Sequence, residues 1–214
     1  MRPALDPTLY VITDSRVAGG RDQIELVRAA IRGGATVVQL RDKELPARDQ
    51  YELGRRLRDL TREVNIPLIV NDRVDLALAI DADGVHLGQD DLPPRVARAL
   101  LGRGRIVGVS AGNPEEFELV RREGADYIGT GPFAATGTKA DAGAAIGPAG
   151  VRAVRAITNL PIVAIGGIGA TNAAAAVGAG ANGVAVISAV LGAEDPERAA
   201  RGLRQIVDAA RRAH

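Results

Sequence analysis

The feature that most constrains the fold is a regular alternation of short apolar segments with longer, more polar segments along the chain. The short segments are rich in Val, Ile and Leu, and few polar residues interrupt them. Strands of this kind have both faces covered, which is typical of a parallel sheet. The predicted strands are Leu9–Thr13, Val37–Arg41, Leu68–Asn71, Gly84–Leu87, Ile106–Ser110, Tyr127–Gly129, Ile162–Ile165 and Gly183–Ile187.

Each predicted strand is followed by a segment of helical length, and glycine often stands between that helix and the next strand, as at Gly124 and Gly180. Eight such units in 214 residues predict one α/β domain, residues 1–214, folded as a (β/α)₈ TIM barrel. An open doubly wound sheet is the alternative, but it would carry a glycine-rich turn after the first strand, and this chain does not. The predicted helices are Asp22–Arg32, Ala47–Val64, Val74–Ile80, Pro93–Leu101, Pro114–Arg122, Pro148–Thr158, Thr171–Gly178 and Asp195–Arg212.

The charge balance argues against two classes of partner. The chain has 27 Lys and Arg against 26 Asp and Glu, so bulk charge would not attract nucleic acid or an anionic membrane. No cysteine is present, which excludes disulfides, thiolate metal sites and a cysteine nucleophile. The uncharged stretch from Ala156 to Ala193 is broken by Pro161 and several glycines, so it predicts buried core rather than a membrane span. We expect a cytoplasmic protein, and a homo-oligomer is compatible with the sequence.

Candidate functional residues stand where the predicted strands end, because ligands bind at that edge of parallel α/β proteins. The second strand runs into Gln39, Arg41 and Lys43, which alternation places on one face. Two cations beside an amide suit an anionic ligand. A solvated surface turn is the alternative.

Acidic residues follow the next two strands. Asn71 and Asp72 end the third strand, and Asp90 and Asp91 lie in the loop after the fourth. Two carboxylates at neighbouring strand ends could hold one Mg²⁺, which would indicate a phosphorylated substrate. The alternatives are a helix N-cap for Asp72 and a turn residue for Asp91. A lone histidine inside a strand, such as His86 in the fourth, is more often a structural group than a base, and no role is assigned to it.

The remaining strand ends supply hydroxyl and main-chain donors. Ser110 ends the fifth strand, and Thr136, Thr138 and Lys139 lie in the long loop after the sixth. The seventh and eighth strands run into Gly166-Gly167 and Ile187-Ser188 without any Lys or Arg, as in barrels that bind phosphate through main-chain N–H groups. The alternatives are a helix N-cap or turn hydroxyl for Ser110, a disordered solvated loop for the segment with Thr136, Thr138 and Lys139, and tight packing of glycines for Gly166-Gly167.

Taken in order and spacing, these segments resemble the thiamine phosphate synthase family from about Leu9 to Glu197. The segments that carry the resemblance are Gln39-Leu40-Arg41-Asp42-Lys43, Asn71-Asp72, His86-Leu87-Gly88-Gln89-Asp90-Asp91, Gly108-Val109-Ser110, Thr136-Gly137-Thr138-Lys139 and Gly166-Gly167-Ile168.

The resemblance implies a Mg²⁺-dependent (β/α)₈ enzyme that joins hydroxymethylpyrimidine diphosphate to hydroxyethylthiazole phosphate, or its carboxylated form, and releases pyrophosphate. It implies metal binding by Asp72 and Asp91. It implies pyrimidine diphosphate binding by Gln39, Arg41, Lys43 and Asn71, with Ser110 and Lys139 also contacting the diphosphate. It implies thiazole phosphate binding by Thr136, Thr138, Gly167, Ile187 and Ser188. Arg41, Lys43, Ser110 and Lys139 are the expected catalytic residues.

The chain departs from the family pattern in the long loop, where Ala134, Ala135 and Ala140 replace bulkier residues or a second lysine. Loop closure is therefore the property that the resemblance leaves open. Two other functions are compatible with the residues: a thiazole phosphate tautomerase of the same fold, and a non-catalytic sensor of phosphorylated metabolites. Retention of both acids and Lys139 favours the synthase.

Overall fold

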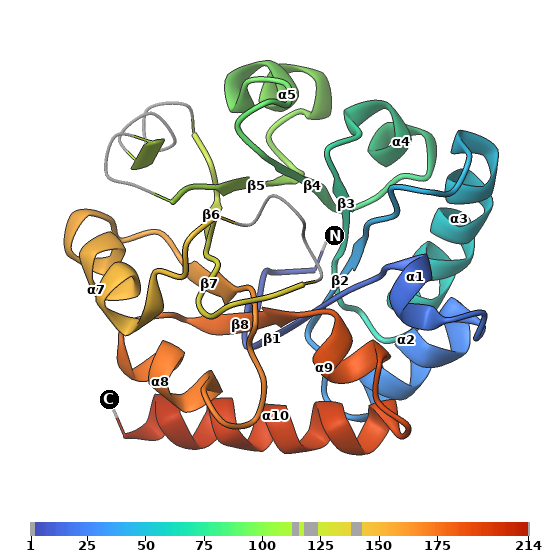
Figure 1. Cartoon of the computed structure of the whole chain (residues 1–214). Coiled ribbons are helices and arrows are strands. Elements are labelled where there is room, and N and C mark those ends of the chain that lie inside the picture. The colour runs from blue at the N-terminus through green and yellow to red at the C-terminus, as the bar shows by residue number, and fades with distance from the viewer. Residues whose placement is uncertain (1–2, 113–115, 118–123, 138–142, 214) are drawn as a thin grey trace.

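The computed structural model describes residues 3–112, 116–117, 124–137 and 143–213. Parallel strands close into a barrel in which each strand pairs with the next and β8 pairs with β1. Figure 1 looks along this barrel, with helices on its outside. The predicted (β/α)₈ fold is confirmed. The strands are β1 Leu9–Ile12, β2 Val37–Leu40, β3 Leu68–Asn71, β4 Gly84–Leu87, β5 Ile106–Ser110, β6 Tyr127–Thr130, β7 Ile162–Ile165 and β8 Gly183–Val186.

The helices lie close to their predicted positions, with two additions. Helices α1 and α9 are four residues each, which is too short for a helical repeat to be visible in the sequence. The predicted helix Pro114–Arg122 falls almost wholly outside the described residues. The helices are α1 Ser15–Ala18, α2 Gln23–Arg32, α3 Ala47–Glu63, α4 Val74–Ala79, α5 Pro94–Leu101, α7 Gly147–Ile157, α8 Ala173–Gly178, α9 Ser188–Leu191 and α10 Pro196–Arg212.

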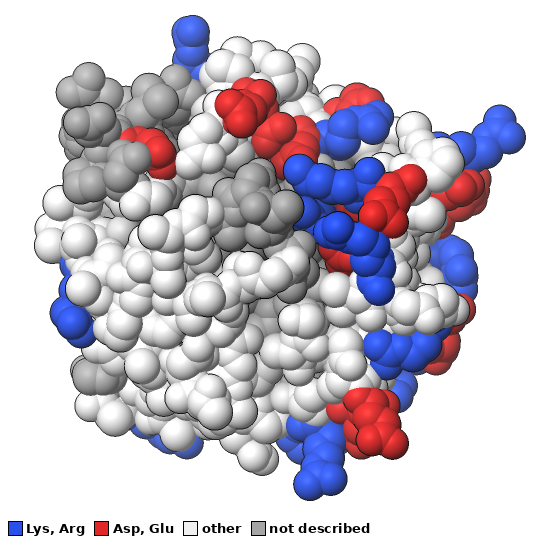
Figure 2. Space-filling model, in the orientation of Figure 1, with Lys and Arg blue, Asp and Glu red and all other residues white. Residues whose placement is uncertain are grey.

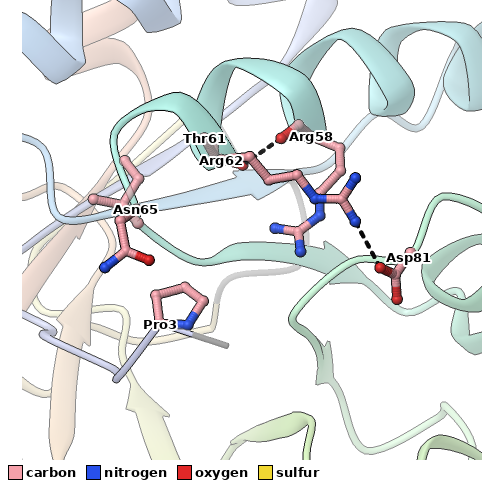
Figure 3. A pocket seen from close by; sticks show the side chains of 7 residues that line it. Pro3, Arg58, Thr61, Arg62, Asn65 and Asp81 are labelled. Carbon is pink, nitrogen blue, oxygen red and sulfur yellow. Dashed lines mark hydrogen bonds and ion pairs between the residues drawn. The ribbon is translucent and has the colours of Figure 1, made fainter. Parts of the chain in front are cut away.

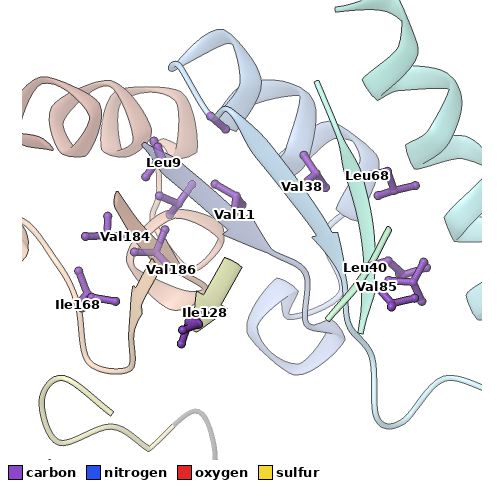
Figure 4. Close-up of a cluster of buried hydrophobic side chains, with 14 of the residues drawn as sticks. Leu9, Val11, Val38, Leu40, Leu68, Val85, Ile128, Ile168, Val184 and Val186 are labelled. Atoms are coloured by element: carbon purple, nitrogen blue, oxygen red, sulfur yellow. The ribbon is translucent and has the colours of Figure 1, made fainter. Parts of the chain in front are cut away.

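Alternation along the strands divides the core into two layers. Outward side chains such as Leu9, Val38 and Val184 pack between the sheet and the helices (Figure 4). Inward side chains fill the barrel itself, and they include two tyrosines. The buried inward cluster consists of Tyr10, Ile12, Val37, Ile69, Tyr127, Val163 and Ala185.

The uncharged stretch predicted to be core is core. It contains β7, α8, β8 and α9, and Ile162, Val184 and Leu191 within it are fully buried. Among the described residues, no helix has both the length and the apolar character needed to cross a membrane.

Candidate active site

An acidic pair lies at the ends of β3 and β4. Asp72 follows β3 with φ 61°, a left-handed conformation that a non-glycine residue adopts at some cost in energy and that clusters at functional sites. Its backbone N–H donates to the carbonyl oxygen of His86, 2.8 Å away. Helix α4 begins after Arg73 without a side-chain cap, so Asp72 is not the helix N-cap that was its alternative role.

Asp91 has a structural contact as well as a place in the pair. Its Oδ2 accepts the Gly88 N–H at 2.7 Å and so closes the turn after β4, as its alternative role predicts. Burial and, after it, the neighbouring Asp91 carboxyl raise the pKa of Asp72 to about 6, while Lys43 and Arg41 act in the opposite direction. The two acids therefore lie together, with both predicted cations near them.

This donor set fits Mg²⁺. Two adjacent carboxylates disfavour each other's charge, and a bound cation would relieve that repulsion. The described residues contain no cluster of three or more His, Cys, Asp or Glu side chains suited to a metal. Mg²⁺ is commonly held by one or two carboxylates, with substrate phosphates and water completing its octahedron. Asp72 and Asp91 meet that smaller requirement.

Arg41 is held rigidly, and Lys43 is not. The Arg41 side chain is only 9% exposed, and its guanidinium donates to Asp14 Oδ2 at 2.9 Å. Asp14 is itself buried and accepts the N–H groups of Arg16 and Val17 as the N-cap of α1. Lys43 is exposed. Lys43 therefore lies in a solvated surface turn, the alternative role for this segment, whereas Arg41 is buried and does not.

Gln39 and Ser110 are joined through the barrel interior. Gln39 Nε2 donates to the Tyr10 hydroxyl at 2.8 Å, and the hydroxyls of Tyr10 and Tyr127 lie 2.9 Å apart. His86 lies 3.0 Å from the Tyr127 hydroxyl through Nδ1 and 2.9 Å from Ser110 Oγ through Nε2. Burial raises the pKa of both tyrosines, which keeps them neutral. His86 is therefore bonded through both ring nitrogens, as is common for a histidine inside a strand.

The ends of β7 and β8 form a region of small residues. Gly167 has φ 63°, and a Cβ there would lie 2.6 Å from the carbonyl oxygen of Ala135, so the loop after β6 packs directly on it. Ser188 begins α9 after Ile187, and the first N–H groups of a helix have no partner within it. Figure 2 shows charged side chains on the side of the face over β2 to β4, whereas the part over β7 and β8 is mostly uncharged.

Two further predicted residues lie on the same edge. Asn71 is the last residue of β3, opposite His86 of β4. Thr136 is half-buried in the loop after β6. Thr138 and Lys139 lie outside the described residues.

A separate cavity of about 410 Å³ lies at the opposite end of the barrel, where barrels of this class carry stabilising contacts rather than chemistry (Figure 3). Arg58 on its wall pairs with the buried Asp83, and Arg62 pairs with Asp81 at 2.6 Å. Of the predicted site residues that the structure describes, none lines this cavity, which is bordered by Pro3, Arg58, Thr61, Arg62, Asn65, Ile66 and Asp81.

Asp14, Tyr10 and Tyr127 were not selected from the sequence, although they hydrogen-bond or pair with predicted site residues, Tyr127 through His86. Asp14 follows the first strand, a strand-end position like those that were chosen. Tyr10 and Tyr127 have inward parity in their strands, and this is the one sequence signal that marks them.

Comparisons with known proteins agree with one another. The family model for thiamine monophosphate synthase matches residues 9–190. The thiamine-phosphate synthase of Moorella thermoacetica is 56% identical over 203 residues, which are 95% of this chain and 97% of that protein. The thiamine-phosphate synthase of Xanthobacter autotrophicus is 54% identical, covering 99% of this chain and 100% of that protein.

A solved structure gives the same result. The thiamine phosphate pyrophosphorylase from Pyrococcus furiosus superposes with a TM-score of 0.87 at 44% identity, covering 96% of this chain and 97% of that one. The matches span nearly the full length in both directions, so they concern the whole barrel and not one segment of it. The chain belongs to the thiamine monophosphate synthase family.

Proposed function

We propose that this transferase joins hydroxymethylpyrimidine diphosphate to hydroxyethylthiazole phosphate, yielding thiamine phosphate and pyrophosphate, with residues 1–214 acting as one barrel domain. The observation that carries the proposal is the placement of Asp72 against Asp91 with Arg41 and Lys43 beside them. Such a mixed cluster suits a magnesium diphosphate, which needs carboxylates for the metal and cations for the phosphates.

The chemistry is a dissociative displacement. The bond between the pyrimidine methylene carbon and the diphosphate oxygen breaks, and its electron pair leaves with pyrophosphate. The electron-rich aminopyrimidine stabilises the resulting carbocation, and the lone pair of the thiazole nitrogen then forms the new C–N bond. Neither step requires a general base or a covalent nucleophile from the protein.

The residues of the chain would act mainly on the leaving group. Arg41, Lys43 and Lys139 would place positive charge where negative charge develops, and the Ser110 hydroxyl would donate a hydrogen bond there. Mg²⁺, when bound by Asp72 and Asp91, would neutralise further charge on the diphosphate oxygens. Gln39 and Asn71 would orient the pyrimidine diphosphate.

The second substrate would bind at the uncharged side of the mouth. Gly167, Ile187 and Ser188 would offer main-chain and hydroxyl groups to the thiazole phosphate, joined by Thr136 and Thr138 from the loop after β6. A helix N-terminus and exposed N–H groups can hold a phosphate without any Lys or Arg.

A coupled assay tests the function. With both substrates and Mg²⁺, we expect stoichiometric thiamine phosphate and pyrophosphate, and we expect none when either substrate is omitted. Running the assay with and without the carboxyl group on the thiazole identifies the form that is used. Thiazole isomerisation without pyrophosphate would instead establish the tautomerase and refute the proposal.

A further inference from the structure

A hydrogen-bonded path crosses the inside of the barrel and connects two proposed substrate-binding residues. It runs from Gln39 on β2 through Tyr10 on β1, Tyr127 on β6 and His86 on β4 to Ser110 on β5. Strands β1 and β6 are not neighbours in the sheet, nor are β6 and β4. The path therefore passes through the interior of the barrel instead of following the wall.

The chain makes room for this path with glycines at inward positions. A Cβ on Gly108 would lie 2.1 Å from the ring carbon Cζ of Tyr127, and one on Gly129 would lie 2.9 Å from Cε1 of His86. Tyr10 and Tyr127 are at most 2% exposed. Buried polar groups are costly unless they are bonded, so a packed apolar interior would be the simpler way to fill this space. The need to fill the barrel interior does not by itself explain why these buried side chains are polar.

The direction of the hydrogen bonds follows from the first donor. The Gln39 amide nitrogen can only donate, so the Tyr10 oxygen accepts from it. The Tyr10 hydroxyl can then donate its own proton to the Tyr127 oxygen. If Tyr10 donates to Tyr127, then Tyr127 donates to Nδ1 of His86, 3.0 Å away. The imidazole in that case carries its proton on Nε2, 2.9 Å from Ser110 Oγ.

We propose that Tyr10, Tyr127 and His86 are positioning residues that hold the Ser110 hydroxyl as a hydrogen-bond donor toward the substrate diphosphate. Because Ser110 Oγ accepts from His86, its own proton must point elsewhere, and a phosphate oxygen is an acceptor only. The reverse direction would turn the Ser110 proton toward His86 and present a lone pair to an anion. The kinetic consequence rests on the proposed function, whereas the direction of the path does not.

The direction is measurable in the free enzyme by nitrogen NMR. The chain has only two histidines, His86 and His214, so ¹⁵N-histidine labelling gives a simple spectrum, and a His214→Ala variant assigns it. The two ring nitrogens of a neutral imidazole resonate well apart. We expect a neutral His86 with its proton on Nε2. A proton on Nδ1, or an imidazolium, would overturn the proposal. This measurement needs no substrate, so failure of the proposed function would leave its result intact.

A double-mutant cycle tests the effect on Ser110. We expect Tyr127→Phe to lower kcat/KM by roughly tenfold, the order of one lost hydrogen bond. In a Ser110→Ala background the same change should cost less than roughly threefold, because the group it positions is gone. Tyr51→Phe, on α3 outside the barrel, is the matched control and should leave kcat/KM unchanged. Equal losses in both backgrounds would refute the positioning role, and the wild-type NMR result decides the direction even if Tyr127→Phe fails to fold.

Discussion

The buried pair of Asp14 and Arg41 gives the sharpest prediction about stability. Asp14 makes two stabilising contacts. Its carboxylate pairs with the Arg41 guanidinium at 2.9 Å, where the Asp14 side chain is 4% exposed and the Arg41 side chain 9% exposed, and it also caps α1. Removing one partner of a buried pair costs about 3–5 kcal/mol, because the other charge stays buried and unpaired. Losing an N-cap costs about 1 kcal/mol. Asp14→Ala should therefore lose roughly 4–6 kcal/mol, a large part of the roughly 5–15 kcal/mol by which a domain is stable.

Asp22→Ala is the matched control. Asp22 caps α2 by accepting the Ile24 N–H at 2.8 Å, and it pairs with Arg56 at 3.4 Å, where both side chains are exposed. Urea unfolding should show a loss of about 1 kcal/mol for Asp22→Ala. Asp14→Asn keeps a capping oxygen without the charge, so it should fall between the two alanine variants and remain folded for kinetics, with kcat/KM lowered because Arg41 loses its anchor. Equal losses of stability for Asp14→Ala and Asp22→Ala would refute the reasoning.

Two further predictions concern pH and packing. The pKa of Asp72 is about 6 in the folded protein against 3.8 for the ordinary carboxyl, so between these values the native state binds more protons. The contribution of Asp72 to the stability of the metal-free protein should fall as pH rises from about 4 to about 6. In urea unfolding, the stability of Asp72→Asn relative to the wild type should therefore rise over this range, and a relative loss would contradict the pKa. Gly108→Ala should lower the free energy of unfolding by at least about 1–3 kcal/mol because its Cβ would overlap Tyr127. Gly104→Ala is the control, because a Cβ there meets no atom of the described residues within 4 Å. Thermal unfolding of both variants measures the difference. Equal melting temperatures would show that the Tyr127 ring can move to accommodate the added methyl group.

The fold was predictable because the hydrophobic pattern carries it. The predicted strands match the observed ones to within a residue at each end, since Val- and Ile-rich runs mark buried strands directly. Helices α1 and α9 were missed because a single turn shows no period. Whether Asp72 caps α4 was also undecidable in the sequence, because the answer depends on a left-handed backbone at Asp72.

The site was predictable where it follows from strand ends and not where it follows from contacts across the barrel. Arg41 and Asp72 could be chosen because parallel strands end on one edge, whereas Asp91 was preferred over Asp90 through the family resemblance. The supporting residues bond over long separations: Tyr10 and Tyr127 are 117 residues apart, and Arg41 and Asp14 are 27 apart. A tyrosine in an apolar strand resembles any core residue until its neighbours inside the barrel are known.

If Asp72 and Asp91 hold the metal that assists pyrophosphate departure, as we propose, removing one of these charges should change the dependence of turnover on Mg²⁺. Asp91→Asn keeps an oxygen for the Gly88 N–H, so the turn after β4 should survive while the charge is lost. Asp90→Asn removes the exposed neighbouring charge and is the control. With Mg²⁺ titrated into the pyrophosphate assay, Asp90→Asn should match the wild type. Asp91→Asn should need far more Mg²⁺ and turn over on the order of a hundredfold more slowly. Wild-type turnover without Mg²⁺, or an Asp91→Asn titration like that of the wild type, would show that these carboxylates do not hold a metal that the reaction needs.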